Sequence, residues 1–381
     1  MKKAQLVFGF SSFFIFGFSL ILNSTLIPVI EKSYSIDHSL IGLALSLGSI
    51  AFLISSLLYG YLLEKYKAFY VIVSGILVLL AGNLTMLFMN SYIMVILGMF
   101  FINFGGGALE VSVPFLIGVS GDGKKGKILN LLHASFAMGA VISPIISSLV
   151  LRYTPYWKSS YLLAVLINLI PLISVYMIKH DILNLHADYL EGSKGSLREV
   201  LNSSLIILVL ALSFYVGYEM NFTSWISTFL FEVRNFDVSN AAIFPSFLWL
   251  GLFLGRSFLS GMPEKMGYKK WLFIVVFLSV VFSTLTIILG KNMIISAIGT
   301  ILTGLAYATT YPTIQAIIVE KYKRNKGIAL SVSSAATSII SGGFSYVIGL
   351  VGTLYGLFSG LIIIVVVNII ELLFISLLKE N

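Results

Sequence analysis

Charged side chains are scarce in this sequence. Lys, Arg, Asp and Glu together make up 10% of the 381 residues, against about 25% in ordinary soluble domains. Hydrophobic residues make up 58%, and the mean hydropathy is +1.00. So few charges cannot cover the surface of a water-soluble protein of this length. The sequence therefore predicts an integral membrane protein, most of which lies within the bilayer.

Cysteine is absent, which excludes disulfides, thiolate metal sites and a cysteine nucleophile. No Gly-x4-Gly-Lys-Ser/Thr loop occurs, so the chain is not expected to drive a pump with ATP. Hydrolase motifs and metal-ligand spacings are also missing, and the sequence predicts neither an enzyme nor a cofactor or metal site. The net charge of +8 is explained by basic loops beside a membrane, without a nucleic-acid partner.

Long apolar runs fill most of the chain. About 20 apolar residues suffice to cross a bilayer as a helix, and the first run is too long for a signal peptide. Twelve membrane helices are predicted, over residues 5–30, 40–63, 69–89, 92–120, 128–151, 159–180, 204–230, 241–261, 271–290, 292–320, 327–351 and 354–378.

The lysines and arginines indicate how the helices are oriented. If both termini are cytoplasmic, 18 of these 24 residues lie in inner segments and 5 in outer ones, while Arg256 lies inside a helix. Cytoplasmic loops are enriched in Lys and Arg. We therefore expect a multi-pass protein of the cell membrane with both termini in the cytoplasm.

A hydrophilic stretch divides the helices into two sets of six. We predict an N-terminal bundle over 1–180, a cytoplasmic linker over 181–203 and a C-terminal bundle over 204–381. Within the linker, Ser196–Glu199 has the pattern of a capping box that opens a short surface helix.

The two sets are weakly alike. Gly106 precedes Pro114 by eight residues and Gly304 precedes Pro312 by eight, at a shift of 198. Such a repeat indicates a duplicated six-helix unit. The predicted fold class is an all-α membrane protein with twelve transmembrane helices in two pseudo-symmetric six-helix bundles.

Glu110 is the most informative polar residue. It lies well inside the run 92–120, where an ionised carboxylate costs roughly 2.5–3.5 kcal/mol on insertion scales. The position shifted by 198 is Ala308, so this acid is not a scaffold feature of both halves. We expect Glu110 to carry a proton or to bind a polar solute. The alternative is a structural acid paired with His133 or Asn130.

Glu219 is a second acid inside a membrane helix, and we predict that it too takes part in proton coupling. The alternative is a structural ion pair or interhelical hydrogen bond. Eight further polar or aromatic residues are predicted to bind a solute by hydrogen bonds and stacking, with core packing or structural hydrogen bonding as the alternative. They are Asn23, Asn130, His133, Asn221, Trp225, Tyr307, Tyr311 and Gln315.

Three charged residues near the inner end of the eighth helix are predicted to form a gating latch at a cytoplasmic loop: Arg256, Glu264 and Lys265. Ordinary snorkelling of positive side chains is the alternative. Glu371, on the last helix near Lys379, is expected to reach the inner interface in the same way.

Five stretches carry a family resemblance: Gly107–Phe115, Leu129–His133, Tyr215–Glu219, Phe247–Arg256 and Tyr311–Thr313. In them the chain resembles the major facilitator superfamily, and within it the fucose–proton symporter group of sugar permeases.

The resemblance implies that Glu110 occupies the place of that group's proton-coupling acid in helix 4. Helix 1 departs from the group's pattern, because Ser24 follows Asn23 where the group has an Asp. The resemblance therefore does not imply a coupling scheme with two acids, one in helix 1 and one in helix 4, for this chain.

We expect a secondary transporter, acting as a monomer, that moves a neutral polar solute, most simply a sugar, by alternating access with proton symport. A second interpretation is an efflux antiporter, because 29 Phe and 11 Met beside buried acids would suit amphipathic cations. The third is a non-transporting receptor or lipid-handling protein on the same scaffold.

Overall fold

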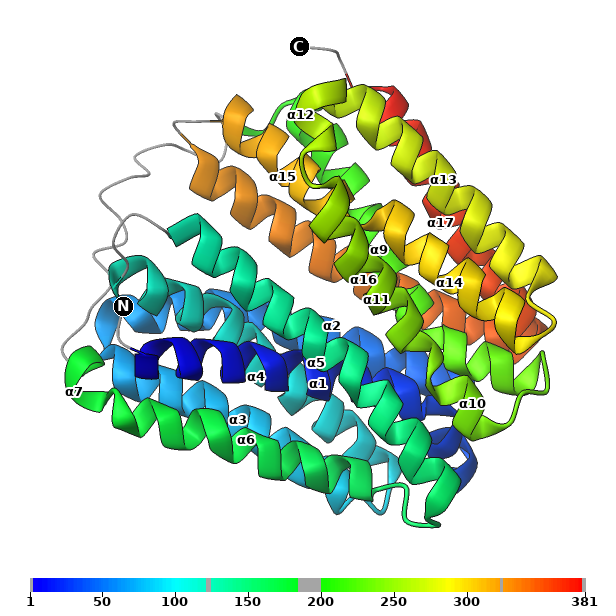
Figure 1. The fold of residues 1–381 in the computed structure, drawn as a ribbon, viewed down its shortest axis with the longest axis horizontal. Helices are drawn as coiled ribbons and strands as arrows, with labels where there is room; N and C mark the ends of the chain where they lie inside the picture. Colours follow the sequence, from blue (N-terminus) through cyan, green and yellow to red (C-terminus); the bar gives the residue numbers. More distant parts are fainter. Residues whose placement is uncertain (1–2, 121–124, 184–199, 323–324, 379–381) are drawn as a thin grey trace. The chain divides into compact units, whose positions relative to one another are not determined.

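The computed structural model describes residues 3–120, 125–183, 200–322 and 325–378. The predicted capping box at Ser196–Glu199 lies outside these residues. Within them every regular element is a helix, and twelve spans are long and apolar enough to cross a membrane (Figure 1). The predicted fold class is thereby confirmed.

Six spans form the first half of the chain, followed by a short helix, α7. Their bounds are α1 (Lys3–Tyr34), α2 (His38–Lys65), α3 (Ala68–Leu87), α4 (Tyr92–Ser120), α5 (Lys125–Tyr153), α6 (Ser159–Met177) and α7 (Lys179–Ile182).

The second half holds the other six spans, two of which consist of two helices each. The helices are α9 (Ser203–Glu232), α10 (Val238–Ala242), α11 (Phe244–Leu259), α12 (Met262–Met266), α13 (Tyr268–Leu289), α14 (Met293–Tyr307), α15 (Thr310–Lys321), α16 (Lys326–Tyr355) and α17 (Leu357–Ser376).

The chain divides into two compact units. The first unit comprises Met1–Ile36 and Leu47–Tyr189, and the second comprises Asp37–Ser46 and Leu190–Asn381. The first turns of α2 thus belong to the second unit, where the Ser39 amide donates to Thr353 Oγ1 at 2.9 Å. The linker limits predicted at 181 and 203 stay a prediction, since most of that stretch lies outside the described residues.

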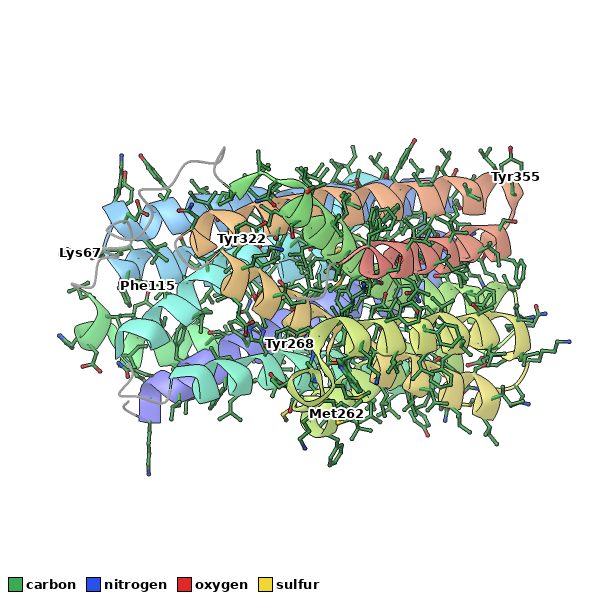
Figure 2. The ribbon with its side chains drawn as sticks, turned by 90° about the horizontal axis from the view of Figure 1, so that it is seen from above. Lys67, Phe115, Met262, Tyr268, Tyr322 and Tyr355 are labelled. Carbon is green, nitrogen blue, oxygen red and sulfur yellow. The ribbon has the colours of Figure 1, made fainter. Side chains whose placement is uncertain are left out.

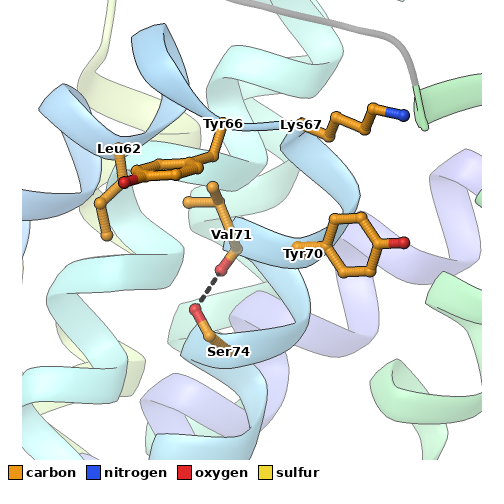
Figure 3. Close-up of a pocket in the computed structure, with 6 residues that line it drawn as sticks. All are labelled: Leu62, Tyr66, Lys67, Tyr70, Val71 and Ser74. Atoms are coloured by element: carbon orange, nitrogen blue, oxygen red, sulfur yellow. Dashed lines mark hydrogen bonds between the residues drawn. The ribbon is translucent and has the colours of Figure 1, made fainter.

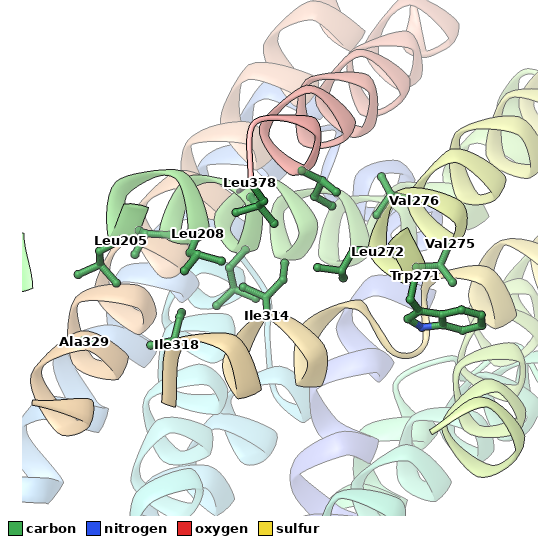
Figure 4. Close-up of a cluster of buried hydrophobic side chains, with 14 of the residues drawn as sticks. Leu205, Leu208, Trp271, Leu272, Val275, Val276, Ile314, Ile318, Ala329 and Leu378 are labelled. Carbon is green, nitrogen blue, oxygen red and sulfur yellow. The ribbon is translucent and has the colours of Figure 1, made fainter. Parts of the chain in front are cut away.

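Apolar side chains fill the interior of each unit. In the first unit α3 packs on α4 and α1 on α5; in the second, α9 packs on α16 and α17, and α11 on α14. Leu208, Leu272 and Ile314 belong to a buried cluster that joins α9, α13 and α15 (Figure 4). Met262 and Tyr322 pack against this cluster, and both lie nearer to Tyr268 than to Tyr355 in Figure 2.

The duplication extends to backbone geometry at a shift of 200. Ser35 and Asn235 both have a positive φ, 50° and 57°. Two residues later, Asp37 and Asp237 each begin a helix, and Oδ1 of each accepts a hydrogen bond from the serine hydroxyl two positions on, at 2.6 and 2.5 Å. The two halves therefore share one turn and one cap, as the predicted pseudo-symmetry requires.

Two membrane spans are interrupted, which the sequence analysis did not predict. The span from Val238 to Leu259 breaks at Ile243, and the span from Met293 to Lys321 breaks between Tyr307 and Thr310. Pro245 and Pro312 follow the breaks. Proline has no backbone N–H, so the carbonyl four residues earlier loses its helical donor. In the second break that carbonyl belongs to Ala308.

Candidate functional site

Glu219 lies at the centre of a polar cluster within the second unit. Its side chain on α9 is buried, and Oε1 accepts a hydrogen bond at 3.1 Å from the hydroxyl of Tyr215, one turn earlier. Arg256 Nη2, on α11, lies 3.8 Å from the same oxygen. The carboxylate therefore has both a donor and a counter-charge, which offset part of the cost of burying it.

Arg256 also forms a hydrogen bond at the break between α14 and α15. Its Nε donates to the Ala308 carbonyl at 3.2 Å, the carbonyl that Pro312 leaves without a helical donor. A Cβ at Gly255 would collide with Ala308, so the glycine lets α11 come this close. Among the described residues Glu219 and Ala308 are the partners of Arg256. One guanidinium thus joins α9 to the broken helix, through an ion pair of its Nη2 with Glu219 and a hydrogen bond from its Nε to Ala308.

Three stacked tyrosines adjoin this pair. The Tyr307 ring lies between those of Tyr215 and Tyr218, with centroid distances of 4.6 and 4.4 Å. The Tyr307 hydroxyl donates to Glu371 Oε2, on α17, at 3.0 Å. Glu371 is completely buried, and its Oε1 has no hydrogen-bond partner among the described residues. The expectation that Glu371 reaches the inner interface is therefore wrong.

Tyr311 and Gln315, predicted to bind a solute, lie beyond the break on α15. Gln315 Nε2 donates to the Tyr311 hydroxyl at 2.8 Å, and the Tyr311 ring centroid lies 6.1 Å from that of Tyr215. Tyr307 is buried, whereas Tyr311 and Gln315 are partly exposed. These two side chains are therefore the accessible polar groups at the edge of the Glu219 cluster.

Asn221 and Trp225 continue along α9, and both are completely buried. Asn221 Nδ2 donates to the Gly217 carbonyl at 2.7 Å and to the Ser341 carbonyl on α16 at 3.3 Å. The Asn221 Oδ1 acceptor and the Trp225 Nε1 donor have no hydrogen-bond partner within the described part of the chain. Buried polar groups without partners are uncommon, and each one needs an explanation.

Glu110 differs from Glu219 in its surroundings. It lies on α4 of the first unit and is partly buried. Among the side chains that the structure describes, which do not include those of residues 117–130, none forms a hydrogen bond or ion pair with its carboxyl. Within that described part of the first unit, Glu110 thus lacks the counter-charge that Arg256 supplies to Glu219.

The other predicted residues of the first unit have separate partners. Asn23 is buried, and its Oδ1 accepts a hydrogen bond from the Tyr161 hydroxyl on α6 at 3.0 Å. The exposed His133 ring meets the Phe13 ring edge-on at 5.4 Å. Asn130 lies on α5, but its side chain is outside the described part. These three assignments stay predictions.

Glu264 and Lys265 lie on the short helix α12, and both are exposed. Neither forms an ion pair with Arg256, whose partners are given above. The latch at a cytoplasmic loop stays a prediction, and the contacts of Arg256 lie within the membrane-spanning helices instead.

Comparison with known proteins identifies the family. The family model described as Major Facilitator Superfamily matches residues 9–296, well over half of the chain. The chain belongs to the Major Facilitator Superfamily. It is therefore a multi-pass membrane protein of a transporter family, which agrees with the resemblance found in its motifs.

Curated members of this superfamily with related sequences include two named for sugars. The glucose/mannose transporter GlcP of Bacillus subtilis is 21% identical over 339 residues, covering 84% of this chain and 82% of GlcP. A putative glucose/galactose transporter of Helicobacter pylori strain J99 is 23% identical over 322 residues, covering 79% of this chain and 78% of the relative.

Solved structures of the superfamily superpose over nearly the whole chain. The D-xylose-proton symporter has a TM-score of 0.77 at 13% identity and covers 99% of this chain and 98% of its own. A mutant of the nucleoside transporter NupG has a TM-score of 0.79 at 14% identity and covers 99% and 100%. At these identities the likeness shows the major facilitator fold alone.

The sequence analysis missed part of the cluster in the second unit. Tyr215 and Tyr218 were not predicted to take part, although each is a polar aromatic residue within one turn of Glu219. Glu371 could have been found by the argument applied to Glu110, because it too is an acid inside an apolar run. The pairing of Glu219 with Arg256 had no sequence signal, since packing between helices creates it.

Proposed function

We propose that this major facilitator protein is a secondary transporter of a sugar, working by alternating access with proton symport. The sugar relatives named above support the solute class. The observation that carries the coupling scheme is the contrast between Glu219, which is paired with Arg256, and Glu110, which has no such partner among the described residues. The protein acts as a monomer in the cell membrane with both termini cytoplasmic.

Glu110 is the proton carrier in this scheme. A carboxyl without a cationic partner can take up a proton on one side of the membrane and release it on the other without first breaking an ion pair. Glu219 would have to separate from Arg256 at each cycle. The serine at position 24 supports a scheme with one carrier, because the family's second acid is missing there.

The solute site uses polar groups that the fold leaves unsatisfied. A sugar carries many hydroxyls and apolar ring faces, so it is bound by hydrogen-bond partners and aromatic rings together. Asn221 Oδ1 and Trp225 Nε1 supply an acceptor and a donor, and Tyr311 and Gln315 supply partly exposed groups. For the first unit, Asn23, Asn130 and His133 are proposed separately as residues that bind solute.

Uptake into proteoliposomes tests the proposal. Vesicles with an imposed inward proton gradient are given labelled glucose, mannose, galactose and xylose, with and without a protonophore. We expect gradient-driven accumulation of at least one sugar, which the protonophore abolishes. No uptake above empty vesicles for any sugar would show that the solute class is wrong.

The variant Glu110→Gln tests the coupling. We expect it to retain exchange of labelled for unlabelled sugar but to lose accumulation against a gradient, because the amide cannot carry a proton. Glu320→Gln, at an exposed acid on α15, is the matched control and should behave as the parent does. Unchanged accumulation in Glu110→Gln would refute the role of Glu110. Extrusion of amphipathic cations would favour the antiporter, and sugar binding without flux the receptor.

A further inference from the structure

An open groove of about 470 Å³ lies in the first unit where α2 ends and α3 begins. Figure 3 shows its lining, in which Val71 lies between Tyr66 and Tyr70, Leu62 lies beside the Tyr66 ring on the side away from Tyr70, and Lys67 is at the turn. Tyr66 and Tyr70 are 57% and 59% exposed. The groove thus combines an apolar floor with a rim of tyrosine and lysine.

The floor of the groove offers little to a polar ligand. Ser74 is its polar residue, and its hydroxyl donates to the Val71 carbonyl at 2.7 Å and lies 2.9 Å from the Tyr59 hydroxyl. Because that hydroxyl is already engaged, what remains is apolar surface. An occupant of the floor is therefore expected to be a hydrocarbon chain.

Exposed apolar side chains continue the floor along both helices. Ile54 and Leu58 precede Leu62 by eight and four residues and lie on the same face of α2, and Leu77 lies one turn beyond Ser74 on α3. Ile54, Leu58 and Leu77 are 48%, 39% and 45% exposed. Both helices are membrane spans, so this stripe runs from the groove into the depth of the bilayer.

Lys67 lines the groove, and two further lysines lie on the adjoining segments, Lys65 at the end of α2 and Lys179 on α7, which packs on α3. Lys67 is exposed at the turn, Lys65 Nζ lies 4.5 Å from the centre of the Tyr61 ring, and Lys179 Nζ lies 5.3 Å from the centre of the Phe69 ring. Among the described residues, the acids beside these three lysines in the chain are Glu64 and Asp181, so the lysines are in excess there. Figure 2 places Lys67 at an end of the first unit.

We propose that this groove binds one anionic phospholipid. Its phosphate lies between Lys65 and Lys67, the rings of Tyr66 and Tyr70 lie at the level of its glycerol, and an acyl chain covers the floor formed by Leu62 and Val71. Tyrosines gather where membrane helices meet the headgroups, and lysines beside them attract anionic lipid.

The proposed orientation strengthens this assignment. With both termini cytoplasmic, the turn between α2 and α3 faces the cytoplasm, where the bacterial and eukaryotic leaflets carry anionic lipid. A soluble phosphate would use the lysines but leave the apolar stripe unexplained. The lipid proposal does not depend on sugar transport or on Glu110.

Lipid titration of the purified full-length protein in detergent tests the proposal. Phosphatidylglycerol is added stepwise, with phosphatidylcholine as the neutral comparison, and both the Tm and the lipid retained in native mass spectrometry are measured. A ligand of the folded state raises the Tm by mass action. We expect phosphatidylglycerol to raise the Tm at lower concentration than phosphatidylcholine and to leave one lipid bound.

Matched variants locate the site. Lys65→Gln/Lys67→Gln should weaken phosphatidylglycerol binding about 5- to 30-fold, since each lysine near the surface contributes to anionic-lipid affinity. Lys269→Gln/Lys270→Gln removes the same charge from the first turn of α13 and should change binding by less than about twofold. Tyr66→Leu/Tyr70→Leu keeps both lysines and should also lose the tightly held lipid.

Three outcomes would overturn the proposal. Equal binding of phosphatidylglycerol and phosphatidylcholine would show that the lipid's charge does not contribute to binding. Equal losses in the two lysine pairs would show a general surface effect and no site. A Tm shift from inorganic phosphate as large as that from the lipid would show an anion site without an acyl chain. The Tm of each variant without added lipid reports whether it folds as the parent does.

Discussion

The Arg256 guanidinium lies 3.8 Å from the Glu219 carboxylate, between two membrane-spanning helices of the second unit. The same side chain donates to the Ala308 carbonyl at the break between α14 and α15. One residue therefore provides the counter-charge of a buried acid and the hydrogen-bond donor of a broken helix. Removing Arg256 leaves the Glu219 carboxylate and the Ala308 carbonyl without these partners, which destabilises the fold.

Arg256→Gln is expected to destabilise the protein by about 1–3 kcal/mol, less than the 3–5 kcal/mol of a fully buried pair, because the Arg256 side chain keeps 34% of its surface exposed. Adding Glu219→Gln should recover part of this loss, since position 219 then holds no carboxylate that has lost its counter-charge. Thermal unfolding of both variants in detergent, completed as a double-mutant cycle, measures the coupling. Additive losses would show that the two side chains do not interact.

Arg256→Lys separates the two contacts of the arginine. A lysine keeps the charge, but its single compact ammonium group cannot sit beside Glu219 and also reproduce the hydrogen bond that Nε donates to the Ala308 carbonyl. We expect stability between those of the parent and Arg256→Gln. Lys265→Gln, at an exposed lysine on α12, serves as the control and should leave the Tm unchanged.

Tyr307→Phe tests the buried contact with Glu371. The substitution keeps the stack with Tyr215 and Tyr218 but removes the hydroxyl that donates to Glu371 Oε2. Leaving a buried acceptor unsatisfied costs about 1–3 kcal/mol, so the Tm should fall. Tyr322→Phe is the matched control, because its hydroxyl binds Asn202 at an exposed position. An equal fall in both variants would contradict a special role for the buried pair.

Asp37, which lies outside the membrane-spanning helices, makes the stability of the fold depend on pH. Hydrogen bonds from the Ser39 hydroxyl and from the Leu40 and Ser39 amides, with the nearby His38, hold its pKa below the usual value near 3.8. A lowered folded-state pKa stabilises the fold above about pH 4, and this stabilisation is lost as the pH falls through the lowered pKa.

Asp37→Ala should therefore be less stable than the parent at pH 7, by about 0.5–2 kcal/mol for a lost helix cap. The difference should shrink as the pH falls through the lowered pKa of the parent carboxyl, because the parent then loses the stabilisation that its carboxylate provides. Thermal unfolding at a series of pH values measures it. Asp237→Ala removes the repeat-related cap and should act alike at pH 7. A difference for Asp37→Ala that does not depend on pH over the whole acidic series would contradict the argument.

The membrane spans could be predicted from hydropathy because the bilayer leaves few ways to satisfy backbone groups. The helix breaks could not. Pro28, Pro114, Pro144 and Pro171 lie inside unbroken helices, whereas the helix before Pro312 breaks. At that break a donor from another helix, Arg256, satisfies the freed carbonyl. Which proline interrupts a helix thus depends on tertiary partners that the local sequence does not contain.

The site shows the same limit. Glu110 and Glu219 could be singled out because an acid inside an apolar run is costly, but only packing shows that one has a cationic partner. Glu371 was assigned to the interface because Lys379 lies eight residues away. Eight residues of ideal helix would measure about 12 Å, long enough for an acid at position 371 to lie in the interior. The number of residues between Glu371 and Lys379 could therefore have indicated that Glu371 is buried.

The absence of cysteine makes the proposed orientation directly testable. Lys269→Cys and Lys291→Cys place single thiols at opposite ends of α13, since one position lies in its first turn and the other just after it ends. With both termini cytoplasmic, a membrane-impermeant maleimide added to intact cells should label position 291 and should label position 269 only after the membrane is opened. Lys158→Cys, in the turn before α6, should behave like position 291. The opposite labelling pattern would invert the orientation, and the lipid groove between α2 and α3 would then face the outer leaflet.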